Sequence, residues 1–493
     1  MALPPELSAI RDEIRQYAVD YGLDFFEVIY EMVDSEQINA LAALGGFPVR
    51  YPHWRFGMDY DQLSKGYTWG LQKIYEMVIN TDPCYAYLMK SNGFVDQKTV
   101  MAHVYGHSDF FKNNYWFSKT DRKMLDSMAN YAVKVRRMMD RFGQERVESF
   151  IDCCLSLENL IDPQLPFRES KKEPEQEEKS LEDLEREGKL HVERDYMREY
   201  INPKEFVESQ RKKIADEKEK EKKFPATPQV DVLQFLMEYA PIEGWQYEVL
   251  SIIRNESYYF VPQRQTKIMN EGWASYWHST IMTQKALKDS EIIDFANQHA
   301  GTMAMAPGQV NPYKVGIELF RDIEDRWNKG KFGKEYDDCD NIIQKEKWDK
   351  KLGKGREKIF EVRSVCNDVT FIDQYLTPEF VDRFKLYTYE YNRRTHQYEI
   401  VDRDFKRVKE KMLIGLTNMG QPFVEIINGN FENKSELLLT HKHQGVDLDQ
   451  RWANETLRCL EQIWQRPVNI ETEVEGQKKL FTCQKGQFNE KST

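Results

Sequence analysis

The sequence predicts a mainly α protein with a small α+β domain at the C-terminus. Apolar residues recur at helical spacing through most of the chain up to about residue 326. After residue 380, β-branched and aromatic residues gather instead in short segments that are typical of strands. The length of 493 residues favours two or more structural units, and the 40% hydrophobic content is ample for a sizeable core.

Residues 1–167 are predicted to form the helical first half of a main domain. Gly45 and Gly46 end the second helical pattern, and Asp96 is predicted to cap the N-terminus of a helix that carries two histidines. Helices are predicted over residues 6–21, 25–44, 96–115, 121–142 and a further segment that ends at residue 160.

The segment 168–223 differs from its surroundings, because charges of both signs replace the apolar pattern. We interpret it as a charged insert or connector, either a solvated helix or a partly disordered link, in preference to a docking element. Residues 224–379 are predicted to be the helical second half of the main domain. Pro262 is expected to interrupt the pattern before the helix that contains Glu271. The helices expected before it cover residues 232–239 and 243–259.

Residues 380–493 are predicted to form the C-terminal α+β domain. Turns are expected at Asn428-Gly429 and at Glu475-Gly476, because both pairs tolerate turn conformations. The domain is predicted to contain strands over residues 397–402, 423–427, 435–441, 468–474 and 478–483, and one helix over 448–464.

Composition excludes several classes of protein. The chain carries 82 acidic and 70 basic residues, a net charge of −12, which argues against general nucleic-acid binding. We expect no membrane span, because no long uninterrupted apolar run occurs, and no signal peptide. The seven cysteines are dispersed without a CxxC spacing, as in proteins with reduced thiols. A cytoplasmic location is therefore expected.

Two motifs contain the residues best suited to chemistry. His103 and His107 are four residues apart, so both imidazoles lie on one face of a helix. Glu271, Ser275 and His278 share one stripe of a second helix for the same reason. Two histidines and one glutamate from another helix form a ligand set that zinc accepts. The sequence therefore predicts a metal site with His103, His107 and Glu271 as ligands.

Both helices are predicted to be buried. Apolar or small residues occupy the other sides of the Glu271 helix, and a buried carboxylate needs a charged or metal partner. Gly106, between the two histidines, costs about 1 kcal/mol relative to alanine in a helix interior. A glycine is easier to accept at this position if another backbone or a ligand approaches closely.

The remaining polar residues of the site are assigned by spacing. Glu271 and His278 are separated by about 10.5 Å of helix rise, so one ion is not expected to contact both. His278 is therefore predicted to assist as an outer partner or by stabilising a transition state. Metalloproteases with an HExxH motif place their general base where this chain has Val104. Glu256 is our first candidate for the missing base, and Asp109 is the second.

Other polar residues have structural and functional interpretations. Two histidines four apart also occur by chance, and buried histidines commonly satisfy hydrogen bonds in the core. His441 and His443 lie on one face of a predicted strand, but a metal site there is the less favoured interpretation. His53 could join the site or pack in an aromatic loop. Three polar residues near Glu271 could hold an anionic substrate or pair with acids. These are Arg254, Gln263 and Lys267.

Several long motifs resemble the stage V sporulation protein R family of bacteria, over nearly the whole chain. They are GGFPVRYPHW at 45–54, MAHVYGHSDFF at 101–111, KIMNEGWASYWH at 267–278, LLLTHKHQG at 437–445 and WQRP at 464–467. The resemblance implies a cytoplasmic protein that acts in formation of the spore cortex, a peptidoglycan layer. It also implies protein partners, since relatives often occur beside a serine protein kinase and a von Willebrand-type protein. The histidine pair and Asn270-Glu271 make the main domain zinc-metallopeptidase-like by analogy.

Three functions are consistent with these observations. The first is a metal-dependent hydrolase of the amidase or peptidase type with zinc as cofactor. The second is a non-haem iron oxygenase, because two histidines and one carboxylate also bind iron. The third is a non-enzymatic assembly factor that acts through protein partners. The sequence identifies neither a substrate nor an oligomeric state.

Overall fold

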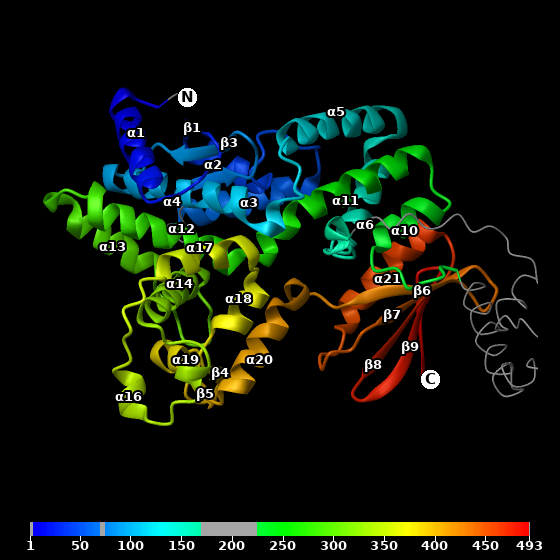
Figure 1. The fold of residues 1–493 in the computed structure, drawn as a ribbon. Helices are drawn as coiled ribbons and strands as arrows, with labels where there is room; N and C mark the ends of the chain where they lie inside the picture. Colours follow the sequence, from blue (N-terminus) through cyan, green and yellow to red (C-terminus); the bar gives the residue numbers. More distant parts are fainter. Residues whose placement is uncertain (1–2, 70–73, 169–223, 493) are drawn as a thin grey trace, which may run out of the picture. The chain divides into compact units, whose positions relative to one another are not determined.

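The protein is mostly helical, with a five-stranded sheet near the C-terminus (Figure 1). The computed structural model describes residues 3–69, 74–168 and 224–492. Two compact units are present, one made of Met1–Glu148 and Tyr258–Gln421 and the other of Ser149–Ser257 and Pro422–Thr493. The prediction of a mainly α protein with a small α+β part at the C-terminus is confirmed. The charged insert predicted over residues 168–223 lies, except for Arg168, outside the described residues.

The first unit consists mainly of helices. The division between the units falls within two helices, α6 (Gln144–Ser156) and α11 (Gly244–Gln265). The helices of the first unit are α1 (Pro5–Asp20), α2 (Ser35–Ala43), α3 (Trp54–Thr68), α4 (Phe94–Asn113), α5 (Met124–Phe142), α12 (Lys267–Ile281), α13 (Ile292–Thr302), α14 (Pro312–Lys329), α15 (Lys334–Asp337), α16 (Ile342–Glu346), α17 (Gly355–Val365), α18 (Asp368–Tyr375), α19 (Pro378–Phe384) and α20 (Phe405–Leu416).

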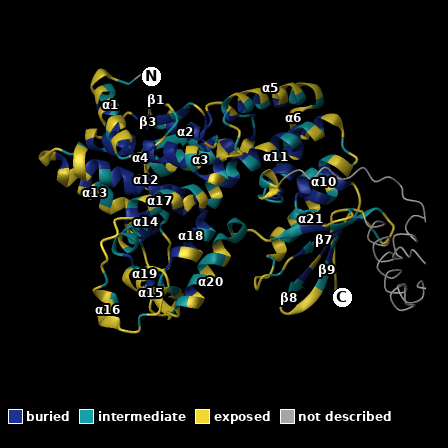
Figure 2. Cartoon of the chain, in the orientation of Figure 1, coloured by how far each residue is buried: buried dark blue, intermediate teal, exposed yellow. Residues whose placement is uncertain are grey.

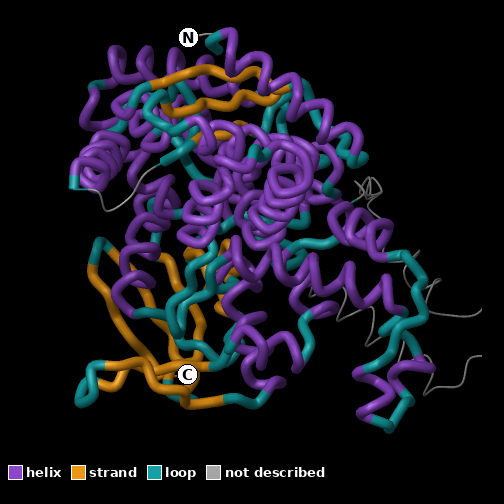
Figure 3. The backbone as a smooth tube through the Cα atoms, turned by 90° about the vertical axis from the view of Figure 1, so that its left-hand side faces the viewer, coloured by secondary structure: helices purple, strands orange, loops and turns teal. Residues whose placement is uncertain are grey.

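A three-stranded sheet lies beside these helices (Figure 3). Its strands are β1 (Val28–Val33), β2 (Glu76–Ile79) and β3 (Cys84–Met89), in the order β1-β3-β2. The prediction of one helix over residues 25–44 is therefore wrong for its first part. The segment is a short apolar run, and helical periodicity cannot distinguish such a run from a strand. The side chain of Asp34 accepts a hydrogen bond from the backbone of Gln37 and begins α2 directly after the strand.

Helix α12 lies between α4 and α14 at two close backbone contacts. A Cβ added to Gly106 of α4 would lie 2.7 Å from the Cα of Ala274. A Cβ added to Gly272 would lie 2.4 Å from the backbone of Gly316 on α14. The expectation that a backbone approaches Gly106 is confirmed. Because no side chain separates the helices at these positions, α12 can pack against both neighbours.

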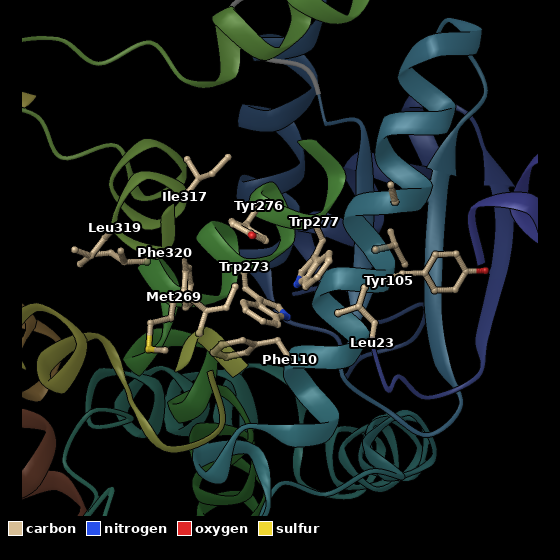
Figure 4. Packing of buried hydrophobic residues seen from close by; sticks show 14 of the residues in the cluster. Leu23, Tyr105, Phe110, Met269, Trp273, Tyr276, Trp277, Ile317, Leu319 and Phe320 are labelled. Atoms are coloured by element: carbon tan, nitrogen blue, oxygen red, sulfur yellow. The ribbon is translucent and has the colours of Figure 1, made fainter. Parts of the chain in front are cut away.

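Aromatic side chains surround the two glycine contacts. Trp273, Tyr276 and Trp277 of α12 belong to one cluster with Phe110 of α4 and Phe320 of α14 (Figure 4). Helices α4 and α12 are buried over nearly their whole length, as Figure 2 shows. Polar residues on either helix are therefore enclosed by this core.

Two predictions about helix ends are wrong. Asp96 lies inside the first turn of α4, where its carboxylate accepts a hydrogen bond from the N–H of Gly93, the capping residue. Helix α11 continues through Pro262 to Gln265. Pro262 has no backbone N–H to donate, but this does not end the helix, because tertiary packing stabilises it.

The start of α12 has a capping partner from a distant part of the chain. The carboxylate of Asp368 accepts hydrogen bonds from two backbone N–H groups in the first turn of α12, those of Ile268 and Met269.

The second unit contains the five-stranded sheet, in the order β10-β9-β8-β7-β6. Strands β7 and β8 are parallel and the other pairs are antiparallel. Helix α21 packs against β8 and β9. Four predicted strands and the predicted helix of this region are confirmed. The elements are α10 (Val232–Tyr239), α21 (Gln450–Trp464), β6 (Val424–Phe431), β7 (Glu436–His441), β8 (Val468–Val474), β9 (Gln477–Gln484) and β10 (Gln487–Ser492).

The remaining predicted strand belongs to the first unit. It is β5 (Gln397–Asp402), which forms a hairpin with β4 (Thr388–Asn392). The predicted turn at Glu475-Gly476 is confirmed, and both residues have positive φ angles of 54° and 76°. The predicted turn at Asn428-Gly429 is wrong, because both residues lie inside β6 beside a register shift. Glycine fits closely there, since an added Cβ would lie 2.7 Å from the ring of Phe224 and the ring would have to shift.

Two further predictions concern the membrane and the thiols. Among the described helices, none is long and apolar enough to cross a membrane. All seven cysteines are free thiols.

Candidate metal centre

The structure brings together the three residues that the sequence predicts as metal ligands. His103 and His107 lie one turn apart on α4, and Glu271 lies on α12. The Nε2 atoms of both histidines lie 3.5 Å from Oε2 of Glu271. One possible ligand atom from each residue lies within 4.8 Å of the other two. The close approach of Gly106 to Ala274 allows the two helices to present these side chains to each other.

The Glu271 carboxylate has one oxygen that no hydrogen bond satisfies. Oε2 is buried and has no hydrogen-bond partner among the described residues, whereas Oε1 lies 3.4 Å from Nζ of Lys267. Leaving a buried acceptor unsatisfied is costly unless another group compensates for it. A divalent cation between Oε2 and the two Nε2 atoms would satisfy all three. The donor set therefore fits a metal ion.

Each of the two imidazoles has an outer hydrogen-bond partner at its Nδ1 atom. Nδ1 of His107 lies 2.8 Å from Oδ1 of Asn270, an acceptor, so Nδ1 carries the proton and Nε2 is free. Nδ1 of His103 lies 2.9 Å from Nδ1 of His278. With the same tautomer, His103 donates a hydrogen bond from Nδ1 to Nδ1 of His278, and Nε2 of His278 lies 3.4 Å from Nδ1 of His299. Partners of this kind fix the orientation of metal-binding histidines.

The sequence prediction for His278 corresponds to this outer position. The sequence did not identify Asn270 or His299 as partners of the histidines. Asn270 could have been suspected because it immediately precedes Glu271. His299 lies on another helix, α13, and no spacing relates it to the other residues.

Electrostatics at the cluster favours neutral histidines and a charged glutamate. Burial and the neighbouring His103 lower the pKa of His107 to about 4, and burial lowers the pKa of His278 as well. Burial alone would raise the pKa of Glu271, but its interactions with His103 and His107 outweigh that effect and lower the pKa to about 2. Metal ligands must be deprotonated, so these shifts favour binding at neutral pH.

The metal-free protein should lose stability as the pH falls from about 6.5 to about 4. The pKa of His107 is about 4 in the folded chain, against an ordinary value of 6.5. In this window the unfolded chain binds a proton that the folded chain excludes, so acidification favours unfolding by about 3 kcal/mol. Urea denaturation of chelator-treated protein at several pH values measures the effect. The variant His107→Gln should lose part of this pH dependence, and an unchanged dependence would contradict the assignment.

Two residues that the sequence did not indicate lie beside the cluster. Glu76 of β2 is half-buried, and burial together with the charge of Glu271 raises the pKa of its carboxyl, while His103 partly offsets the shift. The ring of Tyr313, in the first turn of α14, stacks 6.2 Å from that of His103. Burial and the charges of Glu271 and Glu76 raise the pKa of its phenol. No local pattern marks either residue, because their relation to the histidines is purely tertiary.

The two bases suggested by the sequence lie in different surroundings. Glu256 is buried on α11, in the part that belongs to the second unit, and its role stays a prediction. The Asp109 carboxylate accepts hydrogen bonds from the backbone of Asp24 and from the indole of Trp273, and it lies 3.5 Å from Arg363. The oxygens of Asp109 thus interact with residues from three other segments of the chain, which favours a structural role.

The other polar candidates have partners of their own. His441 is paired with Thr472, and His443 with Asp447. Within the described residues, neither histidine belongs to a group of three possible metal ligands. Arg254 forms two hydrogen bonds with the carboxylate of Asp231.

The remaining two candidates, His53 and Gln263, also interact with neighbouring groups of the fold. His53 accepts a hydrogen bond from the backbone of Arg55 at the start of α3 and packs against Trp54 and Phe56. This contact favours the packing interpretation. With its side-chain amide turned over, Gln263 donates to backbone carbonyls of its own helix.

The fold and the cluster together define a mostly helical protein with a buried two-histidine, one-glutamate centre. Comparison with known families matches residues 3–421 to a family described as "SpoVR like protein" and residues 422–475 to the "SpoVR-like C-terminal domain". The chain belongs to this SpoVR-like family. The boundary at residue 421 coincides with the point where the chain last leaves the first unit. Membership in this family fits a sporulation-related role.

A similar protein occurs in Escherichia coli K12. It carries the name "Uncharacterized protein YcgB" and is 31% identical over 498 residues, which cover 94% of this chain and 91% of that protein. No solved structure matches the chain. Similarity of the main domain to zinc metallopeptidases therefore stays a prediction.

Proposed function

We propose that this protein is a metal-dependent hydrolase that cleaves an amide bond and contributes to formation of the spore cortex. One observation carries the proposal: a buried, unsatisfied carboxylate oxygen of Glu271 faces two imidazole nitrogens at 3.5 Å each. Such a set leaves further coordination positions open, as in catalytic zinc sites. The cortex assignment is supported by the family, and the chemistry by the cluster.

The residues around the cluster have different roles in the proposed hydrolysis. Zinc bound by His103, His107 and Glu271 would supply Lewis-acid polarisation of a carbonyl and lower the pKa of a water molecule. Glu76 accepts the proton of the attacking water, since burial raises its pKa toward the range of an effective base. Tyr313 donates a hydrogen bond to the carbonyl oxygen as negative charge develops on it.

Glu76 provides the group that is missing from the histidine motif. Val104 occupies the position of the usual HExxH glutamate and is fully buried. The carboxyl of Glu76 comes from a strand instead of the histidine helix, and its pKa responds to the charges of His103 and Glu271. His278 is a positioning residue, because it acts on the reaction only through His103.

The proposal is tested with protein purified without a histidine tag, by metal analysis and by turnover of cytoplasmic peptidoglycan precursors. Wild type should contain one equivalent of zinc and release an amino acid or peptide. Glu271→Gln should lose both metal and turnover. Glu76→Gln should keep the metal and lose roughly 100- to 10,000-fold in rate, the range for a missing general base. Glu31→Gln is the matched control, because Glu31 is also half-buried and lies in the same sheet.

The alternatives give distinct results in the same experiment. Iron in place of zinc, lost in Glu271→Gln, would favour the oxygenase. A protein that takes up no metal even after reconstitution would contradict both enzymatic functions and leave an assembly factor. Metal without turnover in any precursor assay would contradict the hydrolase on these substrates.

A further inference from the structure

The first unit contains a cavity that no part of the proposed hydrolysis uses. It has a volume of about 470 Å³ and lies among residues 305–310, the segment that leads into β4, and α20. Small-molecule sites occupy roughly 300–1,000 Å³, so the cavity is large enough for a metabolite-sized ligand.

Most of the cavity wall is apolar. The side chains come from four separate segments, so the cavity depends on tertiary packing. They include Met305, Val310, Phe384, Leu386, Val408 and Met412. An apolar wall of this kind favours a hydrocarbon or aromatic body over a sugar or a nucleotide.

Two lysines give the cavity a positive charge. Lys385 and Lys411 both line it and are exposed. Within the described residues, neither ammonium group forms an ion pair or a side-chain hydrogen bond. The lining residues that the structure describes include no aspartate or glutamate, although the whole chain has a net charge of −12. The cavity is thus a positively charged region of a protein whose net charge is negative.

From these observations we infer that the cavity binds an anionic amphiphile, a molecule with an apolar body and one carboxylate or phosphate head. The apolar body fills the cavity and the head lies between Lys385 and Lys411. Burying the body removes apolar surface from water, while the exposed head retains most of its hydration. The inference goes beyond the proposed hydrolysis and does not require a metal.

The cavity and the candidate metal centre share the helix α12, and the loop 305–310 of the cavity leads into α14. Ile268 lines the cavity and lies three residues before Glu271 on α12. The loop 305–310 leads directly into the first turn of α14, where Tyr313 stacks on His103. A ligand in the cavity therefore contacts elements that also position the cluster.

Gly415 offers a way to block the cavity without disturbing the fold. It lines the cavity on α20, and a Cβ added to it would meet no atom within 4 Å. Gly415→Leu should therefore fill the space that the ligand occupies. Gly57→Leu is the matched control, because Gly57 lies on α3, away from the cavity lining, and is equally open.

Isothermal titration calorimetry with decanoate, decyl phosphate and decanol tests the inference. Both anions should bind wild type, and the tighter one identifies the preferred head group. Gly415→Leu should weaken binding at least tenfold, and Gly57→Leu should bind like wild type. Denaturation midpoints of both variants verify that they are folded. Equal affinities of folded Gly415→Leu and Gly57→Leu would overturn the inference, as would absence of binding to wild type.

The role of charge is tested separately. Lys385→Asn and Lys411→Gln should each weaken anion binding by about threefold, the size of one exposed ion pair, and should leave decanol binding unchanged. Lys406→Gln, also on α20 but outside the lining, should have no effect. Anion affinity that survives both lysine changes would overturn the assignment of the head group. The titrations are repeated with metal-free Glu271→Gln protein, in which binding should persist, so failure of the hydrolase proposal is distinguishable.

Discussion

Zinc added to metal-free protein should raise the free energy of unfolding by about 4 kcal/mol when the free ion is a thousandfold above its dissociation constant. The ligands come from α4 and α12, which are far apart in the sequence, so the unfolded chain cannot assemble the site. Zinc binding therefore stabilises only the folded state. Urea denaturation with buffered zinc and with a chelator measures the difference.

Variants determine whether the stabilisation arises at the predicted cluster. Glu271→Gln should abolish the zinc effect, because it removes the carboxylate that both histidines face. Asn270→Ala should weaken zinc binding by roughly 10- to 100-fold, as loss of an outer partner of a ligand histidine commonly does. An equal zinc effect in wild type and Glu271→Gln would contradict this location of the site.

Replacing Gly272 by alanine should destabilise the first unit by about 3 kcal/mol or more. The added Cβ would lie 2.4 Å from backbone atoms of Gly316, and a backbone cannot move aside as a flexible side chain can. Helices α12 and α14 must therefore separate, and the shift also displaces Glu271 from the histidines. The midpoint of urea denaturation measures the first effect, and zinc affinity measures the second.

Gly57→Ala is the control for the change in helix propensity. Gly57 is the fourth residue of α3, and its added Cβ would meet no atom within 4 Å. Alanine should stabilise this exposed position by up to about 1 kcal/mol. If Gly272→Ala has the same effect as Gly57→Ala, the close contact of α12 with α14 is not important for stability.

Much of the fold follows from patterns that neighbouring residues create. Helical spacing predicts α10 and α21, and segments rich in β-branched and aromatic residues predict β7, β8 and β9 close to their observed bounds. The candidate ligands were identified in the same way. Helical spacing places His103 and His107 on one face of a helix, and it places Glu271 on the polar stripe of another. Burial of both helices followed from their uniformly apolar or small residues.

Other features depend on residues far away in the chain. Residues 28–33 form a strand because β3 pairs with them, and Asn428-Gly429 is held in β6 instead of a turn because Phe224 packs against it. Helix α11 passes through Pro262 because its surroundings outweigh the local preference of proline. In each case a long-range contact overrides a local signal.

The candidate site shows the same division. The sequence by itself predicted which three side chains form the candidate metal site, since helix geometry relates residues only a few positions apart. Only the tertiary structure decided that α4 and α12 meet at Gly106, and that Glu76 and Tyr313 lie beside the cluster. The physical reason is that a helical period is recorded in adjacent residues, whereas contact between distant segments depends on the packing of the whole unit.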